Sequence, residues 1–242
     1  MTLRRPRIIP RLAIKGESVI VTVNMEGLRK VGKPADLARQ YAESDIDELL
    51  YLDAVASLYG RNQLERLIEE TCSEVFVPIT VGGGIQTCEH VRSLLRAGAD
   101  KIAINTSAVN NPILITRIAE EFGSQALVIS IEAKRVQSMN TWEAYTENGR
   151  QRTGKDAVAW AHEAVKLGAG ELLITSIDKE GTRRGCDLEL IKAIAPNVPV
   201  PVIACGGIGS VQDVNAVAKL GACVAISSAL HTNSLSLSEI NR

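Results

Sequence analysis

Short apolar runs alternate with amphipathic stretches along the whole chain. Each run is almost continuously apolar, which is typical of a strand covered on both faces. The intervening segments, for example 33–42 and 87–96, have the spacing of amphipathic helices. This alternation predicts an α/β protein with a parallel sheet. We expect eight strands, near residues 7–13, 47–53, 77–81, 101–105, 126–131, 170–176, 200–204 and 222–227.

Glycines follow several of the expected helices, as is usual just beyond a helix end: Gly98, Gly123, Gly168 and Gly221. Eight strand–helix units of about 30 residues each account for the length of a TIM barrel, the (β/α)8 fold. We therefore expect one such barrel domain over residues 1–242. A doubly wound open sheet is the structural alternative, but it seldom contains eight such regular units.

An internal repeat supports the barrel. Val77-Pro-Ile79 matches Val200-Pro-Val202, and Gly83-Gly-Ile85 matches Gly206-Gly-Ile208, with the same offset of 123 residues. This spacing predicts two duplicated half-barrels, each with a long first loop, at about 14–32 and 133–154. The second loop alternates in polarity around Asn148-Gly149, which indicates a small hairpin.

Composition narrows the class of protein. The chain has 27 Lys+Arg and 28 Asp+Glu, and only 3% aromatic residues, which disfavours nucleic acid as a partner. No apolar run reaches the roughly 18 residues that cross a membrane. Five scattered cysteines without a CxxC pair, and three histidines without ligand spacing, predict no metal site and no cofactor. The basic start lacks the apolar core of a signal peptide, so we expect a cytoplasmic protein with reduced thiols.

Two glycine clusters indicate phosphate binding. Active sites of (β/α)8 barrels lie at the carboxyl ends of the strands, where Gly82-Gly83-Gly84 follows the third strand and Gly206-Gly207 the seventh. Backbone N–H groups can approach an anion closely at glycine. The next strand of each half ends in small polar residues, Asn105-Thr106 and Ser227-Ser228, and Ala229 follows the second pair. We expect a ligand with a phosphate at each end; the alternative is that these glycines only form tight turns.

Several longer stretches are similar to one known family: residues 80–85, 97–106, 122–125, 132–135 and 168–182. They resemble the HisF family, the cyclase subunits of imidazole glycerol phosphate synthase, whereas the sister isomerase of histidine biosynthesis matches them less well. The resemblance implies a lyase that binds a long bis-phosphate ribonucleotide and uses ammonia from a glutaminase, a class I glutamine amidotransferase. It also implies the products imidazole glycerol phosphate and AICAR, the aminoimidazole carboxamide ribotide.

The chain departs from the family at its catalytic residues. The resemblance implies a catalytic Asp at position 13, where this chain has Ala13, and a second carboxylate at Glu132, where the family has Asp. A methyl group cannot move a proton, and losing a general acid or base costs about 10²–10⁴-fold in rate. Arg11 replaces a small residue and is expected to occupy the substrate mouth or to pair with Glu132. Cys205 replaces a Ser, and Val21 stands where the family's first loop has Lys.

The resemblance also implies roles at both ends of the barrel. At the mouth it implies an active-site position for Asp53, Thr175, Asp178, Glu180 and Gly181. The alternative for these residues is that they are loop caps and surface charges. At the opposite end it implies an ammonia gate formed by Arg7, Glu48, Lys101 and Glu171, with Asp100 at the glutaminase interface. A stabilising layer of ion pairs is the alternative there.

Three hypotheses remain from the sequence. The first is a divergent paralogue that binds a phosphorylated ligand and receives ammonia from a glutaminase, for use on another substrate. The second is a functional cyclase in which Glu132 carries the proton transfers alone. The third is a non-catalytic scaffold that regulates a glutaminase. The changes at the mouth favour the first hypothesis over the second.

Overall fold

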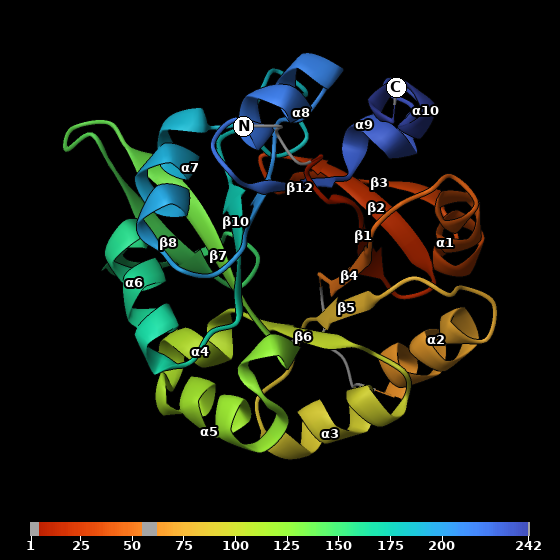
Figure 1. The fold of residues 1–242 in the computed structure, drawn as a ribbon, viewed down its shortest axis with the longest axis horizontal. Coiled ribbons are helices and arrows are strands. Elements are labelled where there is room, and N and C mark those ends of the chain that lie inside the picture. The colour runs from red at the N-terminus through yellow and green to blue at the C-terminus, as the bar shows by residue number, and fades with distance from the viewer. Residues whose placement is uncertain (1–4, 55–61, 242) are drawn as a thin grey trace.

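A closed barrel of parallel strands forms the centre of the computed structural model, which describes residues 5–54 and 62–241 (Figure 1). Each strand pairs in parallel with the next, and the last pairs with the first, which closes the barrel. The predicted TIM barrel is confirmed. In barrel order the strands are β1 (Ile8–Lys15), β4 (Leu49–Asp53), β5 (Ile79–Gly82), β6 (Lys101–Ile104), β7 (Leu127–Val136), β10 (Glu171–Ser176), β11 (Val202–Cys205) and β12 (Cys223–Ile226).

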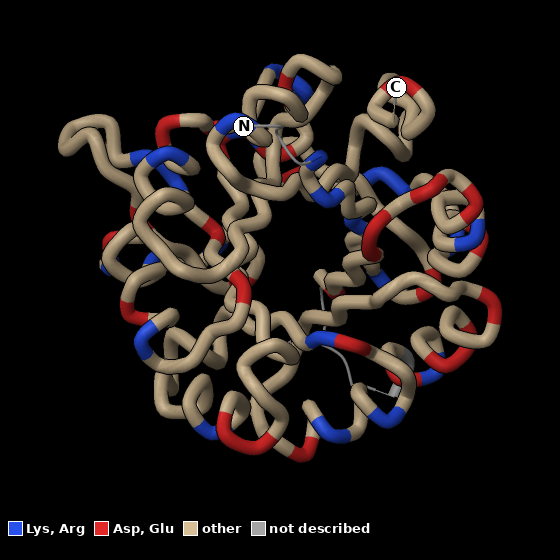
Figure 2. The backbone as a smooth tube through the Cα atoms, viewed as in Figure 1, with Lys and Arg blue, Asp and Glu red and all other residues tan. Residues whose placement is uncertain are grey.

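Helices surround the barrel, and Figure 2 shows Lys, Arg, Asp and Glu interspersed on this outer ring. The two helices predicted over 33–42 and 87–96 are confirmed. The second begins at Thr87, whose side chain accepts the backbone N–H of His90. The helices are α1 (Pro34–Ala42), α2 (Asn62–Cys72), α3 (Cys88–Arg96), α4 (Thr106–Asn110), α5 (Ile113–Phe122), α6 (Ala157–Leu167), α7 (Leu188–Ile194), α8 (Val211–Ala218), α9 (Ser228–His231) and α10 (Leu237–Ile240).

Both long loops form antiparallel hairpins. The predicted second hairpin is confirmed as β8 (Thr141–Thr146) and β9 (Gln151–Asp156), with Asn148 and Gly149 at positive φ in the turn. The first loop, which the sequence analysis left without strands, contains β2 (Ser18–Val23) and β3 (Glu26–Gly32). Its turn places Asn24 and Met25 at φ 52° and 64°. Asparagine favours that conformation but methionine is rare in it, so the turn lacks the Asn-Gly pair that indicates a hairpin.

The strands alternate between two faces, as pleated strands must. On β1, Ile8 and Leu12 pack outward under the helices, whereas Ile9 and Arg11 lie on the inner face. A compact apolar layer fills the middle of the barrel; it consists of Ile9, Leu50, Ala103, Val128, Leu173, Ile203, Cys205 and Ala225. This layer separates the amino ends of the strands from the mouth at their carboxyl ends. No helix in the described part of the chain has the length and apolar character to cross a membrane.

Candidate active site

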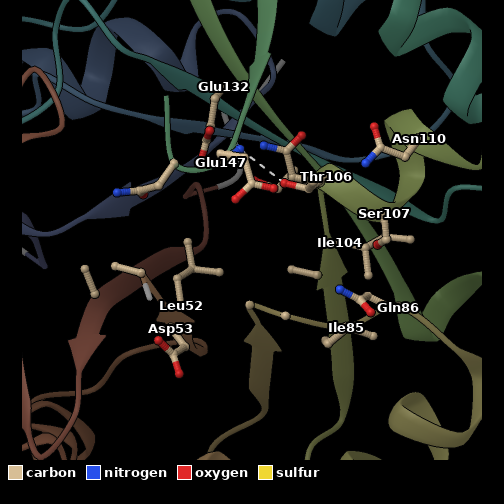
Figure 3. A pocket seen from close by; sticks show the side chains of 18 of the residues that line it. Leu52, Asp53, Ile85, Gln86, Ile104, Thr106, Ser107, Asn110, Glu132 and Glu147 are labelled. Atoms are coloured by element: carbon tan, nitrogen blue, oxygen red, sulfur yellow. Dashed lines mark hydrogen bonds between the residues drawn. The ribbon is translucent and has the colours of Figure 1, made fainter. Parts of the chain in front are cut away.

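A cavity of about 320 Å³ opens at the carboxyl ends of β1, β4, β5, β6 and β7. Figure 3 shows Glu132 and Glu147 on one side of it and Leu52 and Asp53 on the other. Its lining combines backbone, amide, hydroxyl and carboxyl groups, which suits a polar ligand. The lining residues that the argument below uses are Arg11, Ala13, Asp53, Gly83, Gly84, Asn105, Thr106, Ser107, Ser130, Glu132 and Arg150.

A second, much smaller pocket of about 10 Å³ lies at the carboxyl ends of β10, β11 and β12. It contains Gly206, Gly207 and Ser228, together with Glu180 and Cys205. The two glycine clusters, which the repeat places 123 residues apart, therefore do lie at one end of the barrel. The two clusters differ in the volume of the pocket beside each, which is about 320 Å³ at the first and about 10 Å³ at the second.

The glycines at both clusters are required by close backbone contacts. Gly83 has φ 114°, and a Cβ there would lie 2.6 Å from the carbonyl oxygen of Asp53. Gly207 has φ 89°, and a Cβ there would lie 2.2 Å from the carbonyl oxygen of Gly185. Tight turns thus account for these glycines by themselves. Phosphate binding at Gly82–Gly84 and Gly206–Gly207 remains a prediction from their position.

Asn105 and Thr106, directly after β6, attach the second hairpin to the mouth of the barrel. The Asn105 side-chain amide donates to the carbonyl oxygen of Tyr145 at 3.1 Å. The Thr106 hydroxyl accepts the backbone N–H of Glu147 at 3.2 Å (Figure 3). Both residues still line the cavity. In the second half, Ser228 lines the small pocket, whereas the Ala229 side chain is fully buried.

Glu132 is a half-buried carboxyl group on the inner face of β7, at the mouth of the barrel. Its Oε2 accepts the backbone N–H of Gly149 at 2.7 Å. Burial raises the pKa of Glu132 to about 7, although the Gly149 hydrogen bond and the positive charge of Arg11 oppose this shift. Such a group can give or accept a proton near neutral pH. At position 13, where the resemblance implies an Asp, the cavity is lined by the methyl group of Ala13.

Arg11 was expected either to occupy the substrate mouth or to pair with Glu132. It occupies the mouth, but its ion-pair partner is Glu180 and not Glu132. Its Nη1 lies 2.9 Å from Oε1 of Glu180 and 3.4 Å from Sγ of Cys205. Both charged side chains of the pair are only 6% exposed. Glu180 is available because the loop after β10 folds back over β11, while Glu132 is held by Gly149. Removing one partner of such a buried pair costs about 3–5 kcal/mol.

The other residues predicted at the mouth have separate environments. Asp53 lines the cavity, whereas Thr175 is buried beside Glu132 in the β7–β10 pairing. The carboxylate of Asp178 accepts the backbone N–H of Arg135 at 2.8 Å, so it has the loop-capping role that the sequence left open. Gly181 packs against the first hairpin, because a Cβ there would lie 1.8 Å from the carbonyl oxygen of Thr22.

Several lining residues were missed by the sequence analysis. Ser130, Ser107 and Arg150 all contribute to the cavity, and Arg150 is exposed at its rim. The hairpin predicted around Asn148-Gly149 was the one signal that could have indicated Arg150. The sequence of that hairpin does not predict that its turn folds over the mouth. His231 is packed: it contacts the Tyr41 hydroxyl and the carbonyl oxygen of Arg11, and burial lowers its pKa to about 4.

The opposite end of the barrel contains the predicted ring of charges. Arg7 lies 3.0 Å from Glu48 and 2.7 Å from Glu171. Lys101 completes the ring at 2.8 Å from Glu48 and 3.1 Å from Glu171. Each cation therefore contacts both anions. The carboxylate of Asp100, on the same end, accepts the backbone N–H of Ile79 at 2.8 Å.

Comparison with known proteins gives a consistent result. The family model described as histidine biosynthesis protein matches residues 7–236. The imidazole glycerol phosphate synthase subunit HisF of Legionella pneumophila is 54% identical over 209 residues, which cover 86% of this chain and 98% of the relative. The HisF subunit of Synechocystis sp. is 44% identical, covering 99% and 93% of the two chains. That of Trichormus variabilis is 45% identical, covering 97% and 93%.

The raised pKa of Glu132 predicts a pH-dependent stability. Because the folded state holds this proton more tightly, the stabilisation is complete below the ordinary value of 4.5 and is lost as the pH rises through about 7. Glu132→Gln keeps the acceptor for Gly149 without a charge. We expect its free energy of unfolding in urea to exceed that of the wild type by up to about 3 kcal/mol near pH 8, and to equal it near pH 4. Glu26→Gln, on an exposed strand, controls for the loss of one charge. An equal difference at both pH values would contradict the assignment.

The ring of charges predicts strong coupling between its members. Lys101→Met leaves Glu48 and Glu171 with Arg7 as their cation, so we expect a loss of about 3–5 kcal/mol in the free energy of unfolding. Adding Glu171→Gln removes one negative charge, and the double variant should lose at least about 1 kcal/mol less than the sum of the single variants. Urea unfolding of all four proteins gives this coupling. Strict additivity would show that the charges act independently.

Proposed function

This chain belongs to the histidine biosynthesis protein family, among the HisF subunits of imidazole glycerol phosphate synthase, and from that premise we propose a divergent role for it. It binds a phosphorylated ligand at the mouth and receives ammonia from a glutaminase that docks at the opposite end. The family's own cyclase reaction is weakened. The unpaired thiols fit the reducing cytoplasm, where we propose that the protein acts.

The ring of charges is the observation that carries the proposal. Arg7, Glu48, Lys101 and Glu171 neutralise one another around the axis of the barrel. Directly above them lies the apolar layer, which an ion would cross only at a high cost in desolvation. Neutral ammonia does not incur that cost. A charged entrance below an apolar interior therefore suits the passage of NH₃ and the rejection of NH₄⁺.

The mouth supports the loss of cyclase chemistry. Two carboxyl groups that act as a unit cannot be replaced by one, and the cavity has the methyl group of Ala13 where the family has an Asp. A specific observation nevertheless favours the functional cyclase as a second candidate. Glu132 has a pKa near 7 and lines the cavity, so it is suited to both acid and base steps near neutral pH.

Turnover separates these two candidates. We expect the purified protein, given ammonium salt and the family's bis-phosphate ribonucleotide, to be at least about 10²-fold slower than the Synechocystis relative. Ala13→Asp alone should not restore the rate, because Arg11 and Glu180 still fill the mouth beside it. Formation of imidazole glycerol phosphate is measured by chromatography, with the relative assayed in parallel. A wild-type rate equal to that of the relative would establish the functional cyclase instead.

Docking of a glutaminase is expected to depend on Phe76. Its side chain is 91% exposed, and it lies just before β5, at the same end of the barrel as Asp100 and the ring. Exposed aromatic side chains at the centre of an interface often contribute much of its affinity. We expect Phe76→Asp to weaken binding to the glutaminase subunit of the Legionella pneumophila synthase by at least about tenfold, in calorimetry.

Met139→Asp is the matched control, because Met139 is 75% exposed in the turn between β7 and β8, beyond the opposite ends of the strands. It should leave the affinity unchanged. If the wild-type protein neither binds the glutaminase nor stimulates its hydrolysis of glutamine, both partner-based functions are wrong. If it stimulates hydrolysis but the ammonia escapes to solvent, the scaffold hypothesis replaces the ammonia-receiving one.

A further inference from the structure

The two halves of the mouth differ in the volume that they offer to a ligand. The cavity beside the first glycine cluster holds about 320 Å³, and the pocket beside the second holds about 10 Å³. The larger value lies at the small end of the range for ligand sites, enough for one compact polar molecule. A ligand with a phosphate on each cluster would have to extend from the cavity into the small pocket.

The Arg11–Glu180 ion pair stands between these two spaces. Arg11 lines the cavity, whereas its partner Glu180 lines the small pocket together with Cys205, which Arg11 also contacts. In the strand order, β12 separates β1 from β11. The Arg11 side chain therefore crosses the inner face of the barrel to reach its partners. The pair and the Cys205 thiol together form a wall across the mouth.

Both ends of this wall are fixed by backbone contacts. The carbonyl oxygen of Arg11 lies 2.9 Å from Nε2 of His231. The backbone N–H of Glu180 donates to Ser176 at 2.9 Å, and its carbonyl oxygen accepts the N–H of Asn24, at the tip of the first hairpin, at 2.8 Å. Each charged side chain is nine-tenths buried. Displacing one of them would leave the other charge without a partner in a buried place, so the wall resists opening.

We propose that this chain takes a compact phosphate monoester, such as a phosphorylated pentose, and that the Arg11–Glu180 pair excludes ligands that span both glycine clusters. This inference rests on the phosphorylated ligand of the proposed function and specifies its class. The phosphate lies against Gly83 and Gly84, with the hydroxyl of Ser107 as a donor. The guanidinium of Arg150, at the rim of the same cavity, supplies the positive charge that a phosphate prefers. The rest of the ligand faces Glu132.

Calorimetric titration with two probes tests the wall. The probes are ribose 5-phosphate and the long bis-phosphate ribonucleotide of the family. We expect the wild type to bind ribose 5-phosphate at least about tenfold more tightly than the long probe. Arg11→Ala with Glu180→Ala removes both charges together, and it should raise the affinity for the long probe by at least about tenfold. Adding Ser228→Asp to this double variant should cancel that gain, because it places a negative charge in the opened second site.

Two matched substitutions locate the monoester. Ser107→Asp places a negative charge in the cavity and should weaken ribose 5-phosphate binding by about tenfold or more, whereas Ser107→Asn, which is neutral, should weaken it less. Arg11→Met with Glu180→Gln also removes both charges, but its side chains are closer in size to the original ones. It serves as the test if the double Ala variant does not fold.

The outcomes separate this inference from the function on which it rests. If the wild type binds the long probe as tightly as ribose 5-phosphate, the wall does not select the ligand, but a phosphorylated ligand is still established. If the wild type binds neither probe, the phosphorylated ligand itself is wrong and the inference falls with it. If Ser107→Asp leaves the binding of ribose 5-phosphate unchanged, the monoester does not lie in the cavity.

Discussion

A charge inside the barrel must find an opposite charge there, because the interior is too tightly packed to supply water in its place. This constraint shapes the molecule at two levels. At the amino ends of the strands, two cations and two anions contact one another in a ring. Near the carboxyl ends, Arg11 and Glu180 form a pair. Between the two levels lies an apolar layer that requires no partner.

The chain departs from the pattern that the resemblance implies at the mouth, and it matches that pattern in the ring. Arg11 and Ala13 lie on the same inner face of β1, so a cation stands two residues below the position where the resemblance implies an acid. Once Arg11 was present, Glu180 or another anion was required to neutralise it. The ring below is separated from this change by the apolar layer and is not affected. The entrance that we propose for ammonia is therefore independent of the residues that differ at the mouth.

The sequence predicted those parts of the site that strand geometry determines. Alternation along a strand places Arg7, Glu48, Lys101 and Glu171 on the inner face, and their position at strand starts brings them to one level. The partner of Arg11 could not be predicted in this way, because Glu180 lies in a loop whose path is set by contacts with Asn24 and Ser176. The hairpin of residues 18–32 was missed for a similar reason, since its turn uses Met25 rather than glycine. The path of such a loop depends on contacts with residues far away in the sequence, which the local sequence does not reveal.

Duplication and asymmetry together define the mouth. The repeated half-barrels give two similar backbones, with glycine turns at equivalent places, and a symmetric pair of sites would follow if the side chains were also repeated. They are not: Arg11 stands two residues before Ala13, whereas the small Ser130 stands two residues before Glu132. The arginine extends over β12 and β11 and fills the second half, while the serine and the methyl group of Ala13 leave the first half open. In the described part of the chain, one long side chain thus makes the two halves of a two-fold scaffold unequal, with about 320 Å³ of space in one half and about 10 Å³ in the other. The carboxyl group of Glu132 lines the larger space.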